Sequence, residues 1–128
     1  MRWFGFDESY SLENEMQYLA ERSGPYDDAL VVCWDGIPCG RIGIYDHDAE
    51  CQSIYIYYWI SSRYRRRGIA RRCICAALDY LRTIGIHEVL FDVDRENLPS
   101  IRLLERIPGV YVKENDHEKY VLYAVKLL

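Results

Sequence analysis

The spacing of apolar and polar positions predicts three helices set among strands. Apolar residues recur every three to four positions over 11–22 and 68–83, the period of an amphipathic helix. A shorter helix is expected over 97–107, because Asn97 stands at a capping position and Pro99 is tolerated in a first turn. On the helix over 68–83 the expected buried face is Ile69, Cys73, Ala77, Tyr80 and Ile84.

Strands are predicted where β-branched and aromatic residues gather between turn signals. The expected strands cover residues 2–6, 29–34, 37–46, 53–60, 87–94, 108–112 and 120–128. An Asp-Gly pair at 35–36 predicts a tight hairpin, and the polar residues 46–50 predict a loop. The almost continuous apolarity of 53–60 predicts a strand covered on both faces.

The order of these elements predicts the fold class. A strand, a helix and three strands are followed by a helix, a strand, a helix and two strands. The strand–helix–strand unit over 53–94 must cross over right-handedly, which makes its two strands parallel. We expect an α/β fold (α+β in some schemes) with a mixed, mostly antiparallel sheet, a central parallel strand pair and helices on both faces. At 128 residues, the chain is the size of a single domain over 1–128.

The amino-acid composition indicates which binding partners and which cellular compartment to expect. The net charge is −4, which favours a neutral or cationic partner over a polyanion. The five cysteines are odd in number and form no Cys-x-x-Cys pair, so we expect reduced thiols, no metal site and a cytoplasmic protein. The first residues lack the apolar run of a signal peptide, and the longest uncharged run, 51–62, is too short for a membrane-spanning helix.

One stretch, "RYRRRGIARR" at 63–72, is strongly basic in this acidic chain. A strand runs into a glycine-containing turn that opens a helix, and the unpaired amides of such a helix start attract anions. Arginines around the turn add forked donors for phosphate oxygens, so a phosphorylated small molecule is expected. A solvated basic face and a nucleic-acid patch are the alternatives, and the net charge argues against nucleic acid. Arg63 and Arg72 are expected to face solvent.

The turn also carries a family pattern. Arg65-x-x-Gly68-x-Ala70 matches Arg/Gln-x-x-Gly-x-Gly/Ala, and the chain resembles the GNAT superfamily of acyl-CoA-dependent N-acetyltransferases. "FDVDRENLPSIRLLERI" resembles the second CoA-contacting motif of that family, in which an Asn ends a strand and a Ser-Ile begins a helix. The order of elements extends the resemblance over nearly the whole chain.

The resemblance implies acetyl-CoA as cosubstrate and a set of binding residues. The backbone of Trp59 and Ile60 would pair with the pantetheine amides, and the Ile60 N–H would polarise the thioester carbonyl. Asn97 and Ser100 would line the cofactor on another side, although Asn97 is equally well explained as a helix cap. The pyrophosphate would be held by the turn and the helix start: Arg65, Arg66, Arg67, Gly68, Ile69, Ala70 and Arg71.

The family's usual acid and base are missing. Aligned on Gly68, the position of the common Glu is Ile54, and the position of the common Tyr is Leu104. Asp92, five residues before Asn97, is the first candidate base, with a plain surface aspartate as the alternative. Weaker candidates for the base are Asp46, His47 and Glu50; weak candidates for the acid are Tyr123 and Tyr111.

Together these features predict an acetyl-CoA-dependent N-acetyltransferase that acts by direct attack in a ternary complex. The acceptor would be a primary amine on a small molecule, a protein N-terminus or a lysine. In this family the acceptor site is built from the first helical region and the last hairpin, here 8–28 and 112–120. The alternative is a CoA-binding module without transferase activity, which Ile54 and Leu104 favour. The aromatic strands are compatible with a homodimer.

Overall fold

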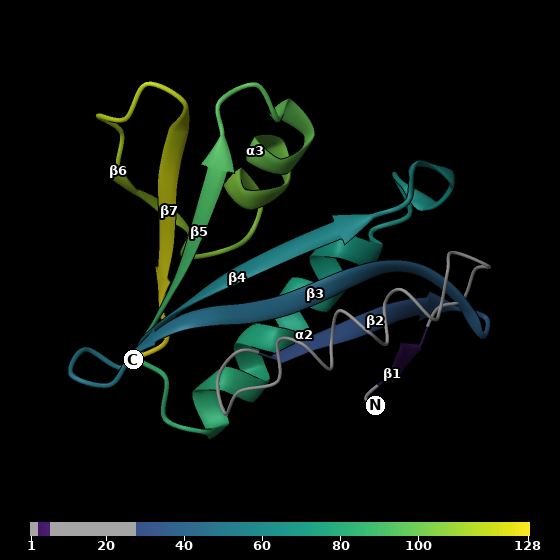
Figure 1. Cartoon of the computed structure of the whole chain (residues 1–128), viewed down its shortest axis with the longest axis horizontal. Helices are drawn as coiled ribbons and strands as arrows, with labels where there is room; N and C mark the ends of the chain where they lie inside the picture. The colour runs from purple at the N-terminus through teal and green to yellow at the C-terminus, as the bar shows by residue number, and fades with distance from the viewer. Residues whose placement is uncertain (1–2, 6–27) are drawn as a thin grey trace. The chain divides into compact units, whose positions relative to one another are not determined.

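The computed structural model describes residues 3–5 and 28–128. Figure 1 shows its elements in chain order. The strands and helices are β1 (Trp3–Gly5), β2 (Asp28–Trp34), β3 (Ile37–Asp48), β4 (Ser53–Ile60), η1 (Ser62–Tyr64), α2 (Ile69–Thr83), β5 (Glu88–Asp94), α3 (Leu98–Glu105), β6 (Tyr111–Glu114) and β7 (Tyr120–Lys126). The helix expected over 11–22 lies outside the described residues, as does nearly all of the 8–28 segment.

The chain forms two compact units. Of the described residues, the first unit contains 3–5, 28–46 and 57–74, and the second contains 47–56 and 75–128. In the first unit the strand order is β1-β2-β3-β4, and in the second it is β4-β5-β7-β6. The long elements β3, β4 and α2 each contribute to both units.

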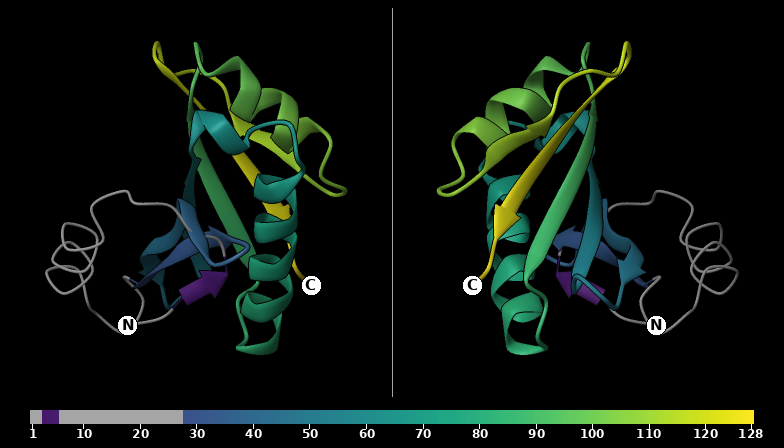
Figure 2. Two further views of the ribbon diagram at one scale, coloured as in Figure 1. Left: turned by 90° about the vertical axis from the view of Figure 1, so that its right-hand side faces the viewer. Right: turned by 90° about the vertical axis from the view of Figure 1, so that its left-hand side faces the viewer.

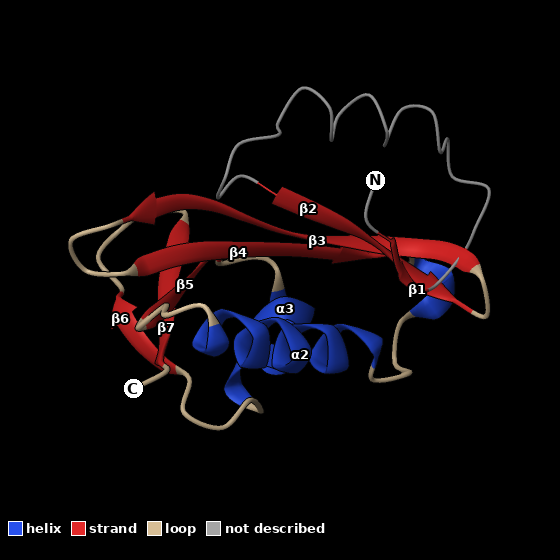
Figure 3. Ribbon diagram, turned by 90° about the horizontal axis from the view of Figure 1, so that it is seen from below, coloured by secondary structure: helices blue, strands red, loops and turns tan. Residues whose placement is uncertain are grey.

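In the first unit a tight turn joins β2 to β3. Asp35 and Gly36 both have positive φ, 52° and 79°, as a two-residue hairpin of this type requires. The two strands pair antiparallel, with a bulge between Val32 and Cys33. On the other side of β2, β1 pairs in parallel, as Figure 3 shows. The expected hairpin at 35–36 is confirmed.

In the second unit β4 and β5 form the expected parallel pair. Their ladder joins Ser53–Tyr55 to Glu88–Leu90. All of β5 then pairs antiparallel with β7, and the two strands lie side by side in Figure 2. The mixed, mostly antiparallel sheet with a parallel pair is therefore confirmed, and β6 forms the edge beyond β7.

The buried face of α2 differs from the expected one. Ile69 and Cys73 are buried as expected, but Tyr80 is 55% exposed and Ile84 is 44% exposed, beyond the helix end. The buried positions are Ile69, Cys73, Ile74, Leu78 and Leu81. These positions keep the three- and four-residue spacing of a helix. The buried face includes 74 and 81 instead of 80 and 84, because a helix with 3.6 residues per turn drifts away from a strict four-residue repeat. Gly85, with φ of 91°, ends the helix as predicted.

Three other expectations need correction. β3 runs through the predicted loop to Asp48, and the turn after it is held by the Asp48 carboxylate, which accepts from the Glu50 N–H at 2.9 Å. β6 begins at Tyr111 instead of 108, because 107–110 forms a turn in which Gly109 has φ of 87°. β4 is buried only in part, and Trp59 is 45% exposed, so cover on both faces was wrong.

No helix in the described part of the chain is both long and apolar enough to span a bilayer.

Candidate functional site

The strand end at Trp59–Ile60 is held in place by a glycine on β3. A β-carbon added at Gly40 would lie 2.2 Å from the Trp59 carbonyl oxygen and 3.0 Å from the Ile60 Cα. Such distances are well inside van der Waals contact, so only glycine lets the two backbones approach this closely. One residue on, the Ser61 N–H donates to the Cys39 carbonyl at 2.6 Å. The residues expected to meet pantetheine are therefore fixed from the β3 side.

The next five residues form one short helical turn followed by a bend. Ser62–Tyr64 is a 3₁₀ helix, in which the Tyr64 N–H donates to the Ser61 carbonyl at 2.9 Å. Arg66 and Gly68 then have positive φ, 63° and 74°. A left-handed arginine costs about 1–2 kcal/mol relative to ordinary backbone, whereas a left-handed glycine costs little. Closely spaced left-handed residues turn successive N–H groups toward a common side, a geometry that suits anions.

The helix start completes this turn. The Gly68 carbonyl accepts the first helical hydrogen bond, from the Arg72 N–H at 3.1 Å. The N–H groups of Ile69, Ala70 and Arg71 precede that bond and have no partner within the helix ladder. Ile69 is 1% exposed and anchors the start. Apart from its chain neighbours, no atom of the described residues lies within 4 Å of a β-carbon built at Gly68. The turn thus presents amides over an open surface, which fits a pyrophosphate.

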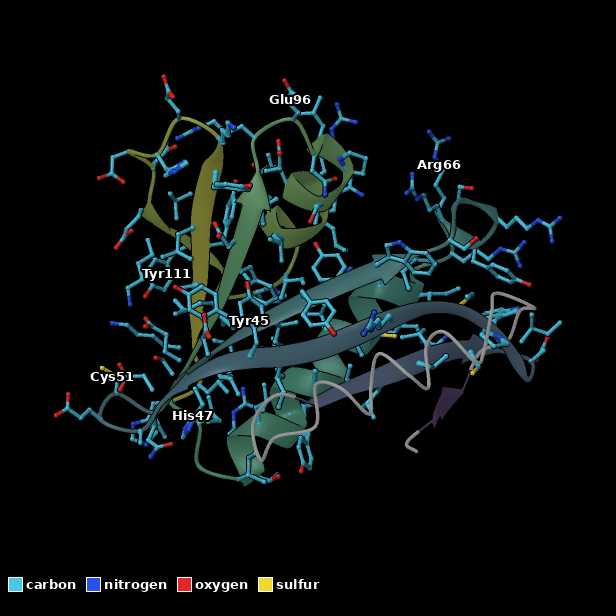
Figure 4. All side chains as sticks on the ribbon, in the orientation of Figure 1. Tyr45, His47, Cys51, Arg66, Glu96 and Tyr111 are labelled. Carbon is cyan, nitrogen blue, oxygen red and sulfur yellow. The ribbon has the colours of Figure 1, made fainter. Side chains whose placement is uncertain are left out.

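The three consecutive arginines of the turn are held differently. The Arg65 Nε donates a long hydrogen bond, 3.4 Å, to the Ile60 carbonyl. The Arg67 guanidinium lies over two rings, 5.3 Å from the centre of Tyr64 and 6.0 Å from that of Trp34. Arg66 is exposed, and Figure 4 shows its side chain projecting outward from the turn. Sequence reasoning missed Trp34, because no local pattern links the end of β2 to residue 67.

In the second unit the predicted asparagine caps α3. The Asn97 Oδ1 accepts from the Ser100 N–H at 3.3 Å, and Pro99 lies in the first turn. Both Asn97 and Pro99 are exposed, and Ser100 is half-buried. The capping role is confirmed, whereas contact of Asn97 or Ser100 with a cofactor stays a prediction.

Asp92 lies on β5 with its side chain exposed. The strand alternates, so Phe91 and Val93 are buried while Asp92 and Asp94 face outward. Asp94 is occupied locally, since its Oδ1 accepts from the Glu96 N–H at 2.8 Å. The backbone of a well-paired strand fixes the position of such a carboxylate, and its exposure gives it access to water. Both properties suit a carboxylate that accepts a proton directly or through water. Its role as the base stays a prediction.

The acid candidates sit in unlike surroundings. Leu104 is completely buried in the core, so the position usual for tyrosine is structural here. Tyr123 is 5% exposed, and burial, followed by the charge of Glu105, raises its pKa. Its hydroxyl therefore stays protonated at neutral pH and is a weak acid. The Tyr111 hydroxyl already donates to the Glu88 Oε2 at 2.7 Å, which raises the pKa of Tyr111.

Glu88 forms a small polar cluster with Tyr111 and Lys113, which the sequence did not indicate. Besides Tyr111, its carboxylate accepts from the Lys113 Nζ, which also forms an ion pair with it. Burial acts to raise the pKa of Glu88, but the hydrogen bonds from Lys113 and Tyr111 outweigh it and leave this pKa lowered. The partners lie more than twenty residues apart in sequence and are brought together by sheet pairing, so no local signal could reveal them.

The weaker base candidates Asp46, His47 and Glu50 lie at the end of β3 and in the turn after it, and their role stays a prediction. The His47 Nε2 lies 3.0 Å from the Gln52 Oε1 at the turn after β3 (Figure 4). All five cysteines are unbridged, and burial raises the pKa of Cys73 to about 12, so it is not a nucleophile at neutral pH. Within residues 3–5 and 28–128, no three His, Cys, Asp or Glu side chains are grouped to hold a metal ion.

The sequence matches a known family over most of its length. Residues 1–108 match the model of the Acetyltransferase (GNAT) domain. The chain is 31% identical over 98 residues to a mycothiol acetyltransferase from Corynebacterium glutamicum (strain R), covering 75% of the chain and 33% of that protein. The chain thus spans about a third of the length of the curated relatives it matches.

Solved structures share the fold at low identity. The spermidine N-acetyltransferase from Vibrio cholerae, in complex with CoA and spermine, has a TM-score of 0.74 at 21% identity, over 95% of this chain and 79% of that one. The Salmonella typhimurium protein YncA, solved with its cofactor acetyl-CoA, has a TM-score of 0.73 at 16% identity, over 91% and 73%.

Proposed function

The chain belongs to the GNAT acetyltransferase family, and on that premise we propose that it is an N-acetyltransferase that uses acetyl-CoA and acts on a primary amine. The observation that carries the proposal is the turn from Ile60 to Ile69. A strand end held by Gly40, two left-handed residues and an open helix start occur where Arg65-x-x-Gly68-x-Ala70 stands in the sequence. Amides and arginines gathered there suit a diphosphate in an otherwise acidic chain.

The turn and the strand end would bind the cosubstrate. The amides of residues 65–70 receive the pyrophosphate, and Arg71 adds a charge from the first helical turn. The backbone of Trp59 and Ile60 pairs with the pantetheine amides. The Ile60 N–H donates to the thioester oxygen, where negative charge grows during attack; one such donor is worth about 3–4 kcal/mol.

Acyl transfer needs a neutral amine and a leaving thiolate. In the proposed reaction the amine nitrogen bonds to the thioester carbon in a ternary complex, and the carbon–sulfur bond then breaks. Asp92 takes the proton that the nitrogen loses, directly or through water. Tyr123 is the weak candidate to protonate the leaving sulfur. A free thiol has a pKa near 8.5, so the thiolate can also leave without a dedicated acid. Burial raises the pKa of Cys73, so this thiol is not a candidate for an acyl-cysteine route.

The acceptor is proposed only as a class. The Vibrio cholerae structure is named for spermidine, a polyamine, and the net charge of −4 suits a cationic acceptor. Primary amines on small molecules, protein N-termini and lysines remain within the proposal. Cytoplasmic location and a homodimer are part of the same expectation.

Two measurements test the proposal. Calorimetry with acetyl-CoA should give a micromolar dissociation constant, and absence of binding at high micromolar concentration would refute the function. Release of free CoA thiol should then be followed across a panel of polyamines, amino-terminal peptides and lysine peptides. Binding without thiol release from any amine would favour a CoA-binding module instead.

A further inference from the structure

We propose that the three consecutive arginines of the turn divide two tasks: Arg65 and Arg67 hold the turn together, and Arg66 alone of the three places its side chain on a cofactor phosphate. The inference rests on the proposed function and assigns roles within that same site. It differs from the sequence-based expectation, which treated all three as equivalent ligands.

Of the two arginines that stabilise the turn, Arg67 has the better-defined contacts. Its guanidinium lies over the rings of Tyr64, from the 3₁₀ turn, and Trp34, from the end of β2. A guanidinium over an aromatic ring is attracted to the ring face, and this cation–π contact ties the turn to the β2–β3 hairpin. The Asp35–Gly36 turn places Trp34 opposite Ile37 at the hairpin tip, so Trp34 is held by the sheet. Trp34 is therefore a positioning residue for the cofactor turn.

Arg65 holds the other end of the turn. Its Nε reaches back to the Ile60 carbonyl, the last residue of β4. That bond spans the 3₁₀ turn and fixes the exit of the strand relative to the start of the bend. An arginine used in this way has its Nε directed at protein backbone.

Arg66 differs from both neighbours in two ways. All three side chains are exposed, but Arg66 makes no hydrogen bond, ion pair or ring contact with the described residues, and its backbone has φ of 63°. A non-glycine residue in this conformation adds strain that glycine would avoid. An arginine kept in a strained position without a protein partner is best explained by a ligand. A phosphate next to the helix-start amides supplies one, because phosphate accepts the guanidinium fork.

A matched series tests the division: Arg65→Gln, Arg66→Gln and Arg67→Gln, with Arg72→Gln as the exposed control one helical turn on. Each variant is assayed for its thermal midpoint and for its CoA dissociation constant at low and high salt. Arg66→Gln should weaken CoA binding about tenfold at low salt and less at high salt, with an unchanged midpoint. Arg67→Gln should lower the midpoint by a few degrees, and Trp34→Leu should do the same while Trp34→Phe does not.

Two further arms sharpen the result. Arg66→Gly should raise the midpoint by about 2–4 °C while it weakens CoA binding, because it relieves the left-handed strain. Comparison of CoA with 3′-dephospho-CoA identifies the phosphate: a loss seen only with CoA places Arg66 on the 3′-phosphate, and an equal loss with both places it on the pyrophosphate.

The outcomes separate this inference from the proposed function. If the wild-type chain binds no CoA, the proposed function fails and this assignment fails with it. If the wild type binds CoA and Arg66→Gln binds it equally well, the function stands and the division of tasks is wrong. An unchanged midpoint in Arg67→Gln, or a lowered one in Arg66→Gly, would also overturn it.

Discussion

Gly40 and Trp59 approach so closely that a β-carbon on the glycine would lie 2.2 Å from the tryptophan carbonyl oxygen. The contact is between two backbones, so no side-chain rotation can relieve it. Gly43, on the same strand, faces a different obstacle. A β-carbon there would lie 2.4 Å from atoms of the Tyr57 ring, which can turn away.

Gly40→Ala should therefore displace the strand end that bears Trp59 and Ile60. We expect a loss of about 1–3 kcal/mol in the free energy of unfolding, typical of overpacking, and at least a severalfold weaker affinity for acetyl-CoA. Denaturant unfolding and calorimetry check the two effects. Gly43→Ala is the matched control, which is expected to reduce stability without weakening the affinity for acetyl-CoA. Equal affinities for the two variants would show that the Gly40 contact does not position the site.

Asp92→Asn should slow turnover by about tenfold to a hundredfold and leave acetyl-CoA binding unchanged, because a carboxamide cannot accept a proton from the amine. Steady-state rates of thiol release and the dissociation constant measure the two effects separately. Asp94→Asn is the control on the same exposed face of β5, and its amide oxygen can still accept from the Glu96 N–H. A normal rate in Asp92→Asn would remove this residue from the mechanism.

Arg95 fastens the last hairpin of the sheet. Its Nε and Nη2 donate to the His117 carbonyl at 2.9 and 2.8 Å, and its Nη2 also donates to the Asn115 carbonyl at 3.0 Å. Lysine cannot reproduce this fork, so Arg95→Lys should cost about 1–3 kcal/mol and speed amide exchange in 115–119.

In the proposed function this hairpin contributes to the acceptor site. Arg95→Lys should then raise the KM for the amine more than the KM for acetyl-CoA. Arg102→Lys, on the exposed face of α3, is the control for a simple change of charge group. An effect confined to acetyl-CoA would place the hairpin away from the acceptor.

The Glu88 cluster predicts a pH dependence of stability. The pKa of Glu88 is lowered in the folded chain, so its contribution is present above the unfolded pKa, about 4.3, and is lost as the pH falls through the lower folded value. The pKa of Tyr111 is raised, so its contribution is present below about pH 10 and is lost as the pH rises through the higher folded value.

Tyr111→Phe should remove about 0.5–1.5 kcal/mol near neutral pH, since it deletes the donor to Glu88, and should flatten both limbs of the profile. Thermal midpoints between pH 3 and 11, converted to free energies, check this. Tyr120→Phe, which keeps the ring that lies 5.2 Å from His117, is the control. A profile for Tyr111→Phe that parallels the wild type would show that the pairing with Glu88 contributes nothing.

Local signals predicted most of the described elements. The strand over 53–60 has the predicted bounds, since seven consecutive β-branched and aromatic residues strongly favour a strand. The Asp-Gly hairpin and the caps at Asn97 and Gly85 followed from short-range chemistry. Tyr80 was misassigned to the buried face because an aromatic at helical spacing reads as core whether or not a partner covers it.

The site was predicted only where it is local. The turn from Arg65 to Ala70 carries its own pattern, so its position was available from the sequence. The contacts that hold it come from Gly40 and Trp34, more than twenty residues earlier, and depend on strand pairing. A lone glycine inside a strand indicates that another backbone approaches closely. Gly40 lies inside the predicted strand over 37–46, so the sequence alone could have indicated this approach.

Arg95 grips the hairpin through carbonyl oxygens, which every amino acid supplies. The Asn115 side chain can therefore be exchanged without loosening the grip, whereas the His117 Nδ1 also accepts from the Lys119 N–H at 3.0 Å. In the proposed function this loop lines the acceptor site, so specificity for the acceptor can evolve there while the Arg95 anchor stays unchanged.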